Sequence, residues 1–447
     1  MEEPAMAQLT GNDKIGQDIY ALAAEIFPIC RSITGDGVRK TIEMLGRYFP
    51  IQCHEIPTGT TVLDWEVPRE WNITDAYIKN AEGVRVVDFH RSNLHVLNYS
   101  APVNGKMPLA ELKGHIFTLP DQPDLIPYRT SYYKEAWGFC MSHRQLAALE
   151  AAGGEYEVMI DSRLEPGALT WGEYLHVGDT ADEVLLSTHA CHPSLANDNC
   201  SGLALLAMLA HELAGKRTRL SYRFLFVPGT IGSIAWLATN EATLGQVKHG
   251  LVLSGVGDAG GPTYKRSRRG DALIDRAMTH VLRASGKEPN LLDFFPYGYD
   301  ERQYCSPGFD LPVGLFQRSQ FATFAEYHTS ADNLDFIRAE HLAASFRWIV
   351  QTLDILERDR RLVSLRPKGE PQLGRRGLYE AIGGERDAWT QNMAMLWTLN
   401  LSDGRHSLLE IAERASLTFD VIASAAAVLE GHGLLAACLD RVDMANL

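Results

Sequence analysis

Hydrophobic residues near the start of the chain recur every three or four positions. One such face consists of Ile15, Ile19, Leu22, Ala23 and Ile26. This spacing predicts an amphipathic helix, and a second helix is predicted from the segment 32–35 to about Tyr48. These helices belong to a first segment, residues 1–60.

The character of the sequence changes after residue 60. From Thr61 to Leu164 the chain is rich in aromatic residues and Pro, and it contains short β-like runs such as 83–87 and 156–160. Turn residues separate these runs. We therefore predict a separate, β-rich domain over residues 61–165.

Short apolar runs alternate with helical patterns from residue 183 onward. The predicted strands are 184–187, 222–227, 250–254 and 311–316, and the predicted helices are 203–213, 273–284 and 341–356. Such alternation is typical of an α/β fold in which helices flank a sheet. If the first helices pack on the same sheet, residues 1–60 and 166–370 form one domain, and the β-rich domain is inserted into it.

A further region follows the Pro- and Gly-containing segment 367–371. Helical patterns at 389–399, 407–415 and 419–432 resemble a winged helix-turn-helix domain, predicted over residues 371–447. Residues 385–447 contain nine acidic and four Arg or Lys residues, a net charge of −5, and the segment 419–430 contains no Arg or Lys. Because helices that read DNA depend on basic side chains to bind phosphates, we expect this domain to bind a protein partner.

Composition excludes several classes of protein. The 447 residues exceed one ordinary core, and the net charge of −14 argues against nucleic acid or an anionic membrane as the main partner. The seven cysteines form no Cys-x-x-Cys pair, so we expect reduced thiols. The acidic start Met1–Pro4 precedes no apolar signal segment, and no run is apolar enough to span a membrane, so we expect a cytoplasmic protein. The sequence leaves a homo-oligomer open.

Residues that commonly bind metal ions follow several predicted strands. His189 ends the first strand of the α/β region, and Asp198 comes just before the helix that follows. Asp258 follows a later strand, and His328 precedes the last helix of this region. Ligand sites gather at the carboxyl ends of the strands in α/β sheets, and imidazole with carboxylate suits zinc. A metal site is therefore predicted, and a hydrogen-bonded core pair is the alternative for His189 and Asp198.

These residues carry a family resemblance. The order of His189, the Asp-Asn-x-Ser-Gly motif at 198–202, Asp258 and His328 resembles the co-catalytic zinc aminopeptidases, in which an aspartate bridges two zinc ions. The segments 65–68, 129–133, 137–140 and 300–304 extend the match to nearly the whole chain. The sequence resembles a bacterial aminopeptidase-like family with an inserted β domain and a C-terminal winged helix, often linked to polysaccharide biosynthesis.

The resemblance implies a role for each of these residues. His189 would bind one zinc ion, Asp198 would bridge, Asp258 would complete the first site and His328 would bind the second. One or two ions fit this set. The implied activity is zinc-dependent hydrolysis of an amide bond in a small peptide, with the zinc-aminopeptidase fold of a mixed sheet flanked by helices.

The sequence departs from the two-zinc peptidases after the strand 222–227. There the peptidases carry two glutamates, a base and a ligand, and relatives with the winged helix typically carry Glu at the first position, but this chain has Gly229 and Thr230. The general base is therefore unsettled. Glu326, Glu301 and His192 are the candidates to replace it.

Three more residues could assist at the site. His192 could be a further ligand or a supporting residue, Arg268 could hold a substrate carboxylate, and Arg129 could lie with nearby aromatic residues in a lid. The basic run 265–269 is more simply read as a solvated face. Two other functions stay open: an amidohydrolase or carrier acting on amino-sugar or polysaccharide precursors, and a metal-binding scaffold that recruits a partner.

Overall fold

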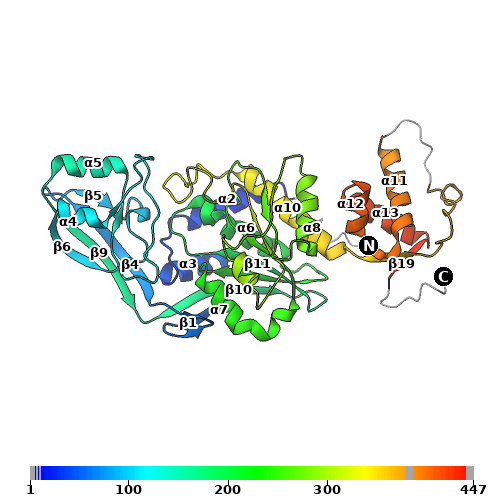
Figure 1. The fold of residues 1–447 in the computed structure, drawn as a ribbon, viewed down its shortest axis with the longest axis horizontal. Helices are drawn as coiled ribbons and strands as arrows, with labels where there is room; N and C mark the ends of the chain where they lie inside the picture. Colours follow the sequence, from blue (N-terminus) through cyan, green and yellow to red (C-terminus); the bar gives the residue numbers. More distant parts are fainter. Residues whose placement is uncertain (1–5, 7–8, 10–11, 379–385, 439–447) are drawn as a thin grey trace. The chain divides into compact units, whose positions relative to one another are not determined.

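The computed structural model describes residues 6, 9, 12–378 and 386–438 (Figure 1). Contacts divide the chain into two compact units, one of Met1–Asp275 with Glu288–Arg347 and one of Arg276–Lys287 with Trp348–Leu447. The acidic start Met1–Pro4, Glu385 and the end of the predicted winged helix, 439–447, lie outside the described residues. None of the described helices is long and apolar enough to cross a membrane.

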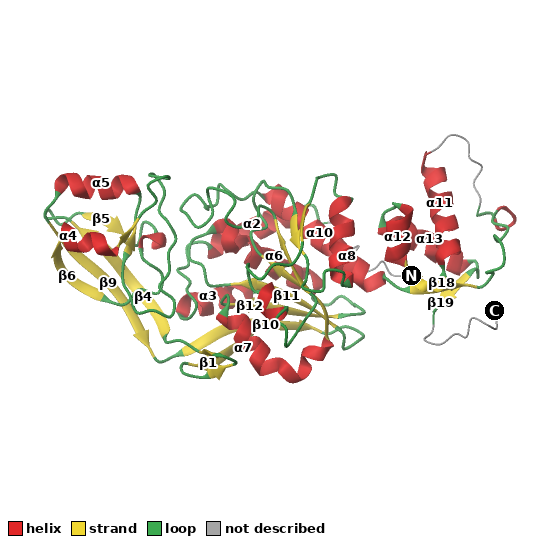
Figure 2. Cartoon of the chain, viewed as in Figure 1, coloured by secondary structure: helices red, strands yellow, loops and turns green. Residues whose placement is uncertain are grey.

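An eight-stranded mixed sheet forms the centre of the first unit (Figure 2). In spatial order its strands are β1 (Gln52–Pro57), β10 (Ala168–His176), β12 (Ser221–Val227), β11 (Glu183–His189), β13 (Val247–Leu253), β16 (Val313–Gln317), β14 (Thr263–Lys265) and β15 (Asn290–Leu292). The four strands from β12 to β16 are parallel, so their carboxyl ends meet at one edge. The predicted α/β class is confirmed.

The strand β11 occupies the point where the strand order reverses. Its successor in the chain, β12, lies on one side of it, and β13 lies on the other. All seven residues of β11 are buried, which explains the continuous apolar run Val184–Leu186. His189 pairs in register with Val227 of β12, so both strands end at the same level. A reversal of this kind leaves a crevice beyond the strand ends, where ligands bind.

Helices α2 (Ile15–Ile26), α3 (Asp36–Leu45), α6 (Gly202–Leu213) and α7 (Ile231–Asn240) belong to the same unit. The predicted apolar face of α2 is buried, which confirms the first helix. The helix α6 is buried along almost its whole length, as its apolar sequence indicates. Gly35 precedes α3 with φ of 99°, and a side chain there would collide with the carbonyl oxygen of Trp71. Helices α8 (Leu273–Arg283) and α10 (Ala339–Arg358) have residues assigned to both units.

The segment between β1 and β10 forms a sheet of its own. Its strands, in spatial order, are β5 (Arg85–Asp88), β4 (Glu70–Lys79), β9 (Glu155–Glu165) and β6 (Val103–Pro108). Two-stranded pairs β2–β3 (Thr61–Val62, Trp65–Glu66) and β7–β8 (Ile116–Phe117, Phe139–Cys140) and helices α4 (Leu109–Leu112) and α5 (His143–Ala152) complete it. Because β1 and β10 are neighbours in the large sheet, this β-rich segment is inserted between two adjacent strands.

The second unit contains a winged helix-turn-helix domain. Helices α11 (Arg386–Leu401), α12 (Leu408–Ala415) and α13 (Phe419–Gly431) accompany strands β17 (Arg361–Ser364), β18 (Asp403–Ser407) and β19 (Leu435–Ala437). The strand β17 pairs with both β18 and β19, so the sheet of this domain begins before residue 371. Ser407 and Glu410 form a capping box that starts α12.

The charges on α13 lead to a first prediction. Asp420 pairs with Arg358, and Glu430 pairs with Arg360, so acidic side chains lie at both ends of the helix that would read DNA. We expect no saturable binding of the full chain to duplex DNA at physiological salt, because few counterions would be released. Fluorescence anisotropy with labelled duplexes measures this, and nanomolar, sequence-specific binding would contradict it.

Candidate metal centre

The carboxylate of Asp198 lies between two imidazoles at the carboxyl edge of the large sheet. His189 Nε2 is 2.9 Å from Asp198 Oδ1, and His328 Nε2 is 3.0 Å from Asp198 Oδ2. These distances suit hydrogen bonds. They are also close to the separation of two ligands of one zinc ion, since atoms about 2.0–2.2 Å from a tetrahedral ion lie roughly 3.3–3.6 Å apart. Each oxygen of one carboxylate thus has its own imidazole, the arrangement expected of a bridging ligand.

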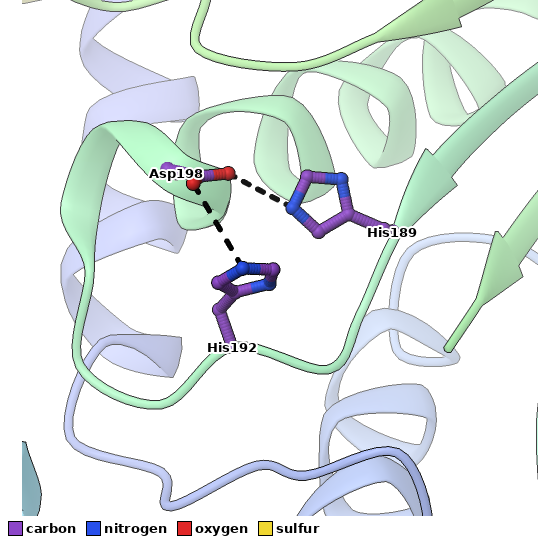
Figure 3. Close-up of side chains that lie close together, drawn as sticks. All are labelled: His189, His192 and Asp198. Atoms are coloured by element: carbon purple, nitrogen blue, oxygen red, sulfur yellow. Dashed lines mark hydrogen bonds and ion pairs between the residues drawn. The ribbon is translucent and has the colours of Figure 1, made fainter. Parts of the chain in front are cut away.

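His192 completes the cluster (Figure 3). Its Nε2 atom is 3.9 Å from Asp198 Oδ2, and the donor atoms of His189, His192 and Asp198 all lie within 4.8 Å of one another. The structure therefore brings together four of the predicted residues. Burial lowers the pKa of His192 well below its usual value, which favours the neutral imidazole that binds metals. Burial alone would raise the pKa of Asp198, but His192 and the other imidazoles hold it well below its usual range.

Two buried side chains fix the backbone around Asp198. The carboxylate of Asp332 accepts hydrogen bonds from the backbone nitrogens of Asn197 (2.6 Å) and Asp198 (2.9 Å). Asn199 donates to the Thr188 hydroxyl (2.7 Å), next to His189 on β11. Burial raises the pKa of Asp332 to about 8, although the two backbone donors oppose this. Asp332, which stands four residues after His328, was not predicted from the sequence as a site residue.

Asp332 provides a second prediction. In Asp332→Asn one oxygen is replaced by an amide group that faces a backbone N–H, so one of the two hydrogen bonds is lost. We expect the free energy of unfolding of the metal-free protein to fall by about 1–3 kcal/mol. Urea unfolding at pH 9, above the pKa of Asp332, measures this, with the exposed Asp335→Asn as the matched control. An unchanged stability would mean that the carboxylate does not hold the turn.

The carboxylate of Asp258 is hydrogen-bonded to residues other than the imidazoles and Asp198. Its Oδ2 atom accepts a hydrogen bond from the Asn197 side chain (2.9 Å), and its Oδ1 atom accepts from the Ser319 hydroxyl (2.6 Å) and the Gly260 nitrogen (2.7 Å). Among the described contacts, none joins Asp258 to the three imidazoles or to Asp198. The residue that directly follows β13 is the buried Ser254. Asp258 stands four residues further along the chain, and its role as a ligand stays a prediction.

The two glutamates proposed as base lie in different surroundings. Glu301 is fully buried and forms an ion pair with Lys265, which is equally buried. Lys265 therefore does not belong to the solvated face predicted for residues 265–269. Glu326 is partly exposed, and no contact in the described residues places its carboxylate against the cluster. The roles of both as base stay predictions.

The two arginines predicted to assist lie in exposed positions. Arg268 pairs with Asp310 at 2.8 Å, with both side chains exposed. Arg129 is exposed in the β-rich segment. The solvated reading therefore fits Arg268, and neither side chain has a described contact with the cluster.

Aromatic rings pack on the predicted ligands. Tyr299 stacks on His189 with 4.9 Å between ring centroids, and Tyr327 stacks on His328 at 4.0 Å. Tyr128 of the β-rich segment contacts the rings of His192 and His328, and its backbone nitrogen donates to the carbonyl of His328. His328 adopts a left-handed φ of 54°, so this bond helps to hold an unfavourable backbone conformation. These contacts fix the imidazole planes.

The aromatic residues predicted as a lid differ in whether they contact the site. The Tyr132 hydroxyl is 3.0 Å from that of Tyr128, so Tyr132 supports the ring that covers the site. Trp137 stacks on His115 within the β-rich segment, and Tyr133 is 51% exposed. Of the three rings, Tyr132 is the one that the contacts join to the site.

Asp300 is a further acid at this edge of the sheet, and it was not predicted from the sequence as a site residue. It is 1% exposed, its Oδ1 atom accepts a hydrogen bond from Ser233 (3.0 Å), and its Oδ2 atom has no partner in the described residues. A Cβ atom at Gly229 would lie 3.2 Å from the Cβ of His189 and 3.5 Å from Asp300 Oδ2. Burial raises the pKa of Asp300 to about 6, and the nearby His189 opposes this. Only its place before Glu301 in the segment 300–304 pointed to it.

Comparisons with known proteins agree with this architecture. The profile of a family described as "Domain of unknown function (DUF4910)" matches residues 20–359, and a winged helix-turn-helix profile matches residues 360–437. A Clostridium acetobutylicum protein, whose name refers to polysaccharide biosynthesis and to an aminopeptidase-like domain, is 49% identical over 421 residues. These residues are 94% of this chain and 96% of that protein.

Solved structures show the same fold. A Clostridium acetobutylicum protein whose name refers to a peptidase superposes with a TM-score of 0.92 at 47% identity, covering 97% of this chain and 99% of that one. A zinc aminopeptidase from Bacillus subtilis superposes with a TM-score of 0.55 at 14% identity, covering 76% of this chain and 93% of that one. At such low identity the similarity shows the fold alone. The chain has the fold of the zinc aminopeptidases, as the sequence predicted.

Proposed function

Because the chain belongs to the DUF4910 family and has the fold of the zinc aminopeptidases, we propose that it is a zinc-dependent hydrolase of amide bonds. The observation that carries this proposal is the position of Asp198, with an imidazole 2.9 Å from one oxygen and another 3.0 Å from the other. A hydrogen-bonded core pair of His189 and Asp198 would not need two more histidines, the half-buried His192 and His328, around the same carboxylate.

The donor set fits zinc. His189, His192 and His328 offer imidazole nitrogens, and Asp198 offers two oxygens, a mixture that zinc prefers over calcium or magnesium. Cys191 is not counted among the donors, since burial raises the pKa of its thiol far above the usual value and its sulfur lies 3.7 Å from the carbonyl oxygen of Gly229. Bound zinc would polarise a carbonyl and supply hydroxide near neutral pH.

The surrounding residues would hold these donors and keep water out. Tyr299 and Tyr327 fix the rings of His189 and His328 by stacking, and Tyr128 covers His192. Asp332 sets the backbone of Asp198 so that both its oxygens face imidazoles. Ligands held in place before the ion arrives lose less entropy on binding.

A second candidate substrate is an N-acyl amino sugar. The name of a relative that is 49% identical refers to polysaccharide biosynthesis, and tyrosine rings at the site could stack on a sugar face. The amide bond of an N-acyl sugar requires the same chemistry as a peptide bond. Peptides and amino-sugar amides therefore both belong in the assay.

The test is a substrate panel with controlled metal content. Aminoacyl p-nitroanilides, dipeptides and N-acetyl amino sugars are incubated with metal-free protein and with protein that has taken up zinc, and Asp198→Asn serves as the control. We expect hydrolysis of one class, dependent on zinc and absent from the variant. If zinc is fully bound and no amide is hydrolysed, the scaffold interpretation replaces this proposal.

A further inference from the structure

The end of β12 lacks a side chain where the site needs an acid or base. Hydrolysis of an amide requires a group that takes a proton from water and returns it to the leaving nitrogen. Gly229 follows β12 beside His189 and offers no such group. Any replacement must reach the same place from another segment of the chain.

The carboxylate of Asp300 reaches that place. Its two oxygens lie 3.5 and 3.6 Å from the position that a Cβ at residue 229 would occupy, and that position is itself 3.2 Å from His189 Cβ. Asp300 Oδ1 is held by the hydroxyl of Ser233, while Oδ2 has no hydrogen-bond partner in the described residues. A buried carboxylate oxygen left unpaired is costly, so its presence points to a group that binds there during function.

A buried network holds this carboxylate in position. The neighbouring Glu301 pairs with Lys265, and the same ammonium donates to the carbonyls of Phe295 (3.2 Å) and Tyr297 (2.9 Å). Tyr299, on the other side of Asp300, stacks on His189. The segment 295–301 is therefore fixed both to the interior and to a predicted ligand. Such fixed positioning is what a group that transfers protons requires.

We propose that Asp300 is the general base and acid of this site, supplying the carboxylate that position 229 lacks. The assignment rests on the proposed amide hydrolysis. A water O–H bond breaks, its oxygen bonds to the carbonyl carbon, and the proton passes to Asp300 Oδ2. When the C–N bond breaks, the proton passes from Asp300 to the leaving nitrogen, which regenerates the carboxylate.

Three variants and a matched control test this assignment. Asp300→Asn keeps an oxygen for Ser233 but cannot take the proton, so kcat should fall by about 10²- to 10⁴-fold while zinc content and melting temperature stay unchanged. The double variant Gly229→Glu/Asp300→Asn places a carboxylate at the end of β12. Its kcat should be at least tenfold higher than that of Asp300→Asn, a gain on the order of the free energy of one hydrogen bond. Gly229→Glu alone puts two acids side by side and should not exceed the native rate. Asp310→Asn, an exposed acid in the same region, should leave kcat unchanged.

A second measurement does not depend on turnover. Acetohydroxamate loses a proton when it binds to zinc, and Asp300 would accept that proton. Its affinity for the zinc-bound protein should therefore fall by about tenfold in Asp300→Asn, with equal zinc content. Isothermal titration at fixed pH measures this for the native protein, Asp300→Asn and Asp310→Asn.

The outcomes separate this inference from the proposed function. If native protein hydrolyses amides and Asp300→Asn retains its kcat and hydroxamate affinity, Asp300 is not the base and the proposed function stands. If Glu326→Gln loses activity while Asp300→Asn retains it, the assignment is overturned in favour of Glu326. If no amide is hydrolysed but hydroxamate binding depends on Asp300, the proposed function fails and the proton-accepting role is supported. Hydroxamate binding that is independent of Asp300 overturns the assignment in either case.

Discussion

Asp198→Ala should abolish stable zinc binding, because both oxygens that face the imidazoles are lost at once. His189 and His328 would each lose the carboxylate that lies 2.9 or 3.0 Å away. Replacing a residue that only supports a ligand typically costs 10- to 100-fold in metal affinity, so losing this shared ligand should cost more than about 100-fold. Elemental analysis of purified protein and competition with a chelator measure the change.

The matched comparison is Asp258→Asn. Asp258 is hydrogen-bonded to Asn197, Ser319 and Gly260, and none of its described contacts involves the imidazoles. We therefore expect this variant to keep zinc while its stability falls, since an amide group would face the Asn197 amide. Equal loss of zinc in both variants would show that Asp258 is a ligand after all. Full zinc content in Asp198→Ala would refute the site.

The sequence predicted the four parallel strands of the large sheet and its main helices because their apolar patterns are determined locally. The fully buried strand β11 reads as an apolar run, and α2 shows its apolar face directly. The strands β14 and β15 were not predicted, since each has only three residues, and the strands β1 and β10 of the same sheet were not predicted either. The helix α7 was not predicted either. It is buried from Ile231 to Leu237, and a short apolar segment of this kind has no clear amphipathic period.

The site was predictable where ligands lie next to regular elements. His189 ends a strand, Asp198 precedes a helix, and the cluster contains both. Asp258 stands four residues beyond the residue that follows β13, and its described hydrogen bonds go to Asn197, Ser319 and Gly260, so its role as a ligand stays a prediction. Asp300 is the opposite case, a candidate site residue that the spacing of the sequence did not indicate. Asp300 is identified as a candidate by its burial and by a carboxylate oxygen without a described partner. Both features depend on its surroundings, which include Ser233 and Gly229 from distant parts of the chain.

Lys265→Met should lower the free energy of unfolding by about 3–5 kcal/mol, because it leaves the carboxylate of Glu301 buried without its cation. Both side chains of this pair are 0% exposed, and neither oxygen of Glu301 has another hydrogen-bond partner in the described residues. Urea unfolding of the native protein and the variant measures the loss. Lys248→Met is the matched control, since Lys248 is exposed and forms a surface ion pair of the kind worth about 0–1 kcal/mol.

The loss in Lys265→Met should depend on pH in a defined direction. Burial already raises the pKa of Glu301 above its usual value, and removing Lys265 raises it further. A carboxyl whose pKa is higher in the folded state stabilises fully below its unfolded pKa of about 4.3 and loses that stabilisation as pH rises toward the folded pKa. The variant should therefore be closer to the native protein at pH 5 than at pH 8. A pH-independent difference below about 0.5 kcal/mol would show that the pair is not desolvated.

The double variant Lys265→Met/Glu301→Gln removes the unpaired buried charge and should recover most of the lost free energy of unfolding. If it does not, the effect lies in the hydrogen bonds of Lys265 to Phe295 and Tyr297.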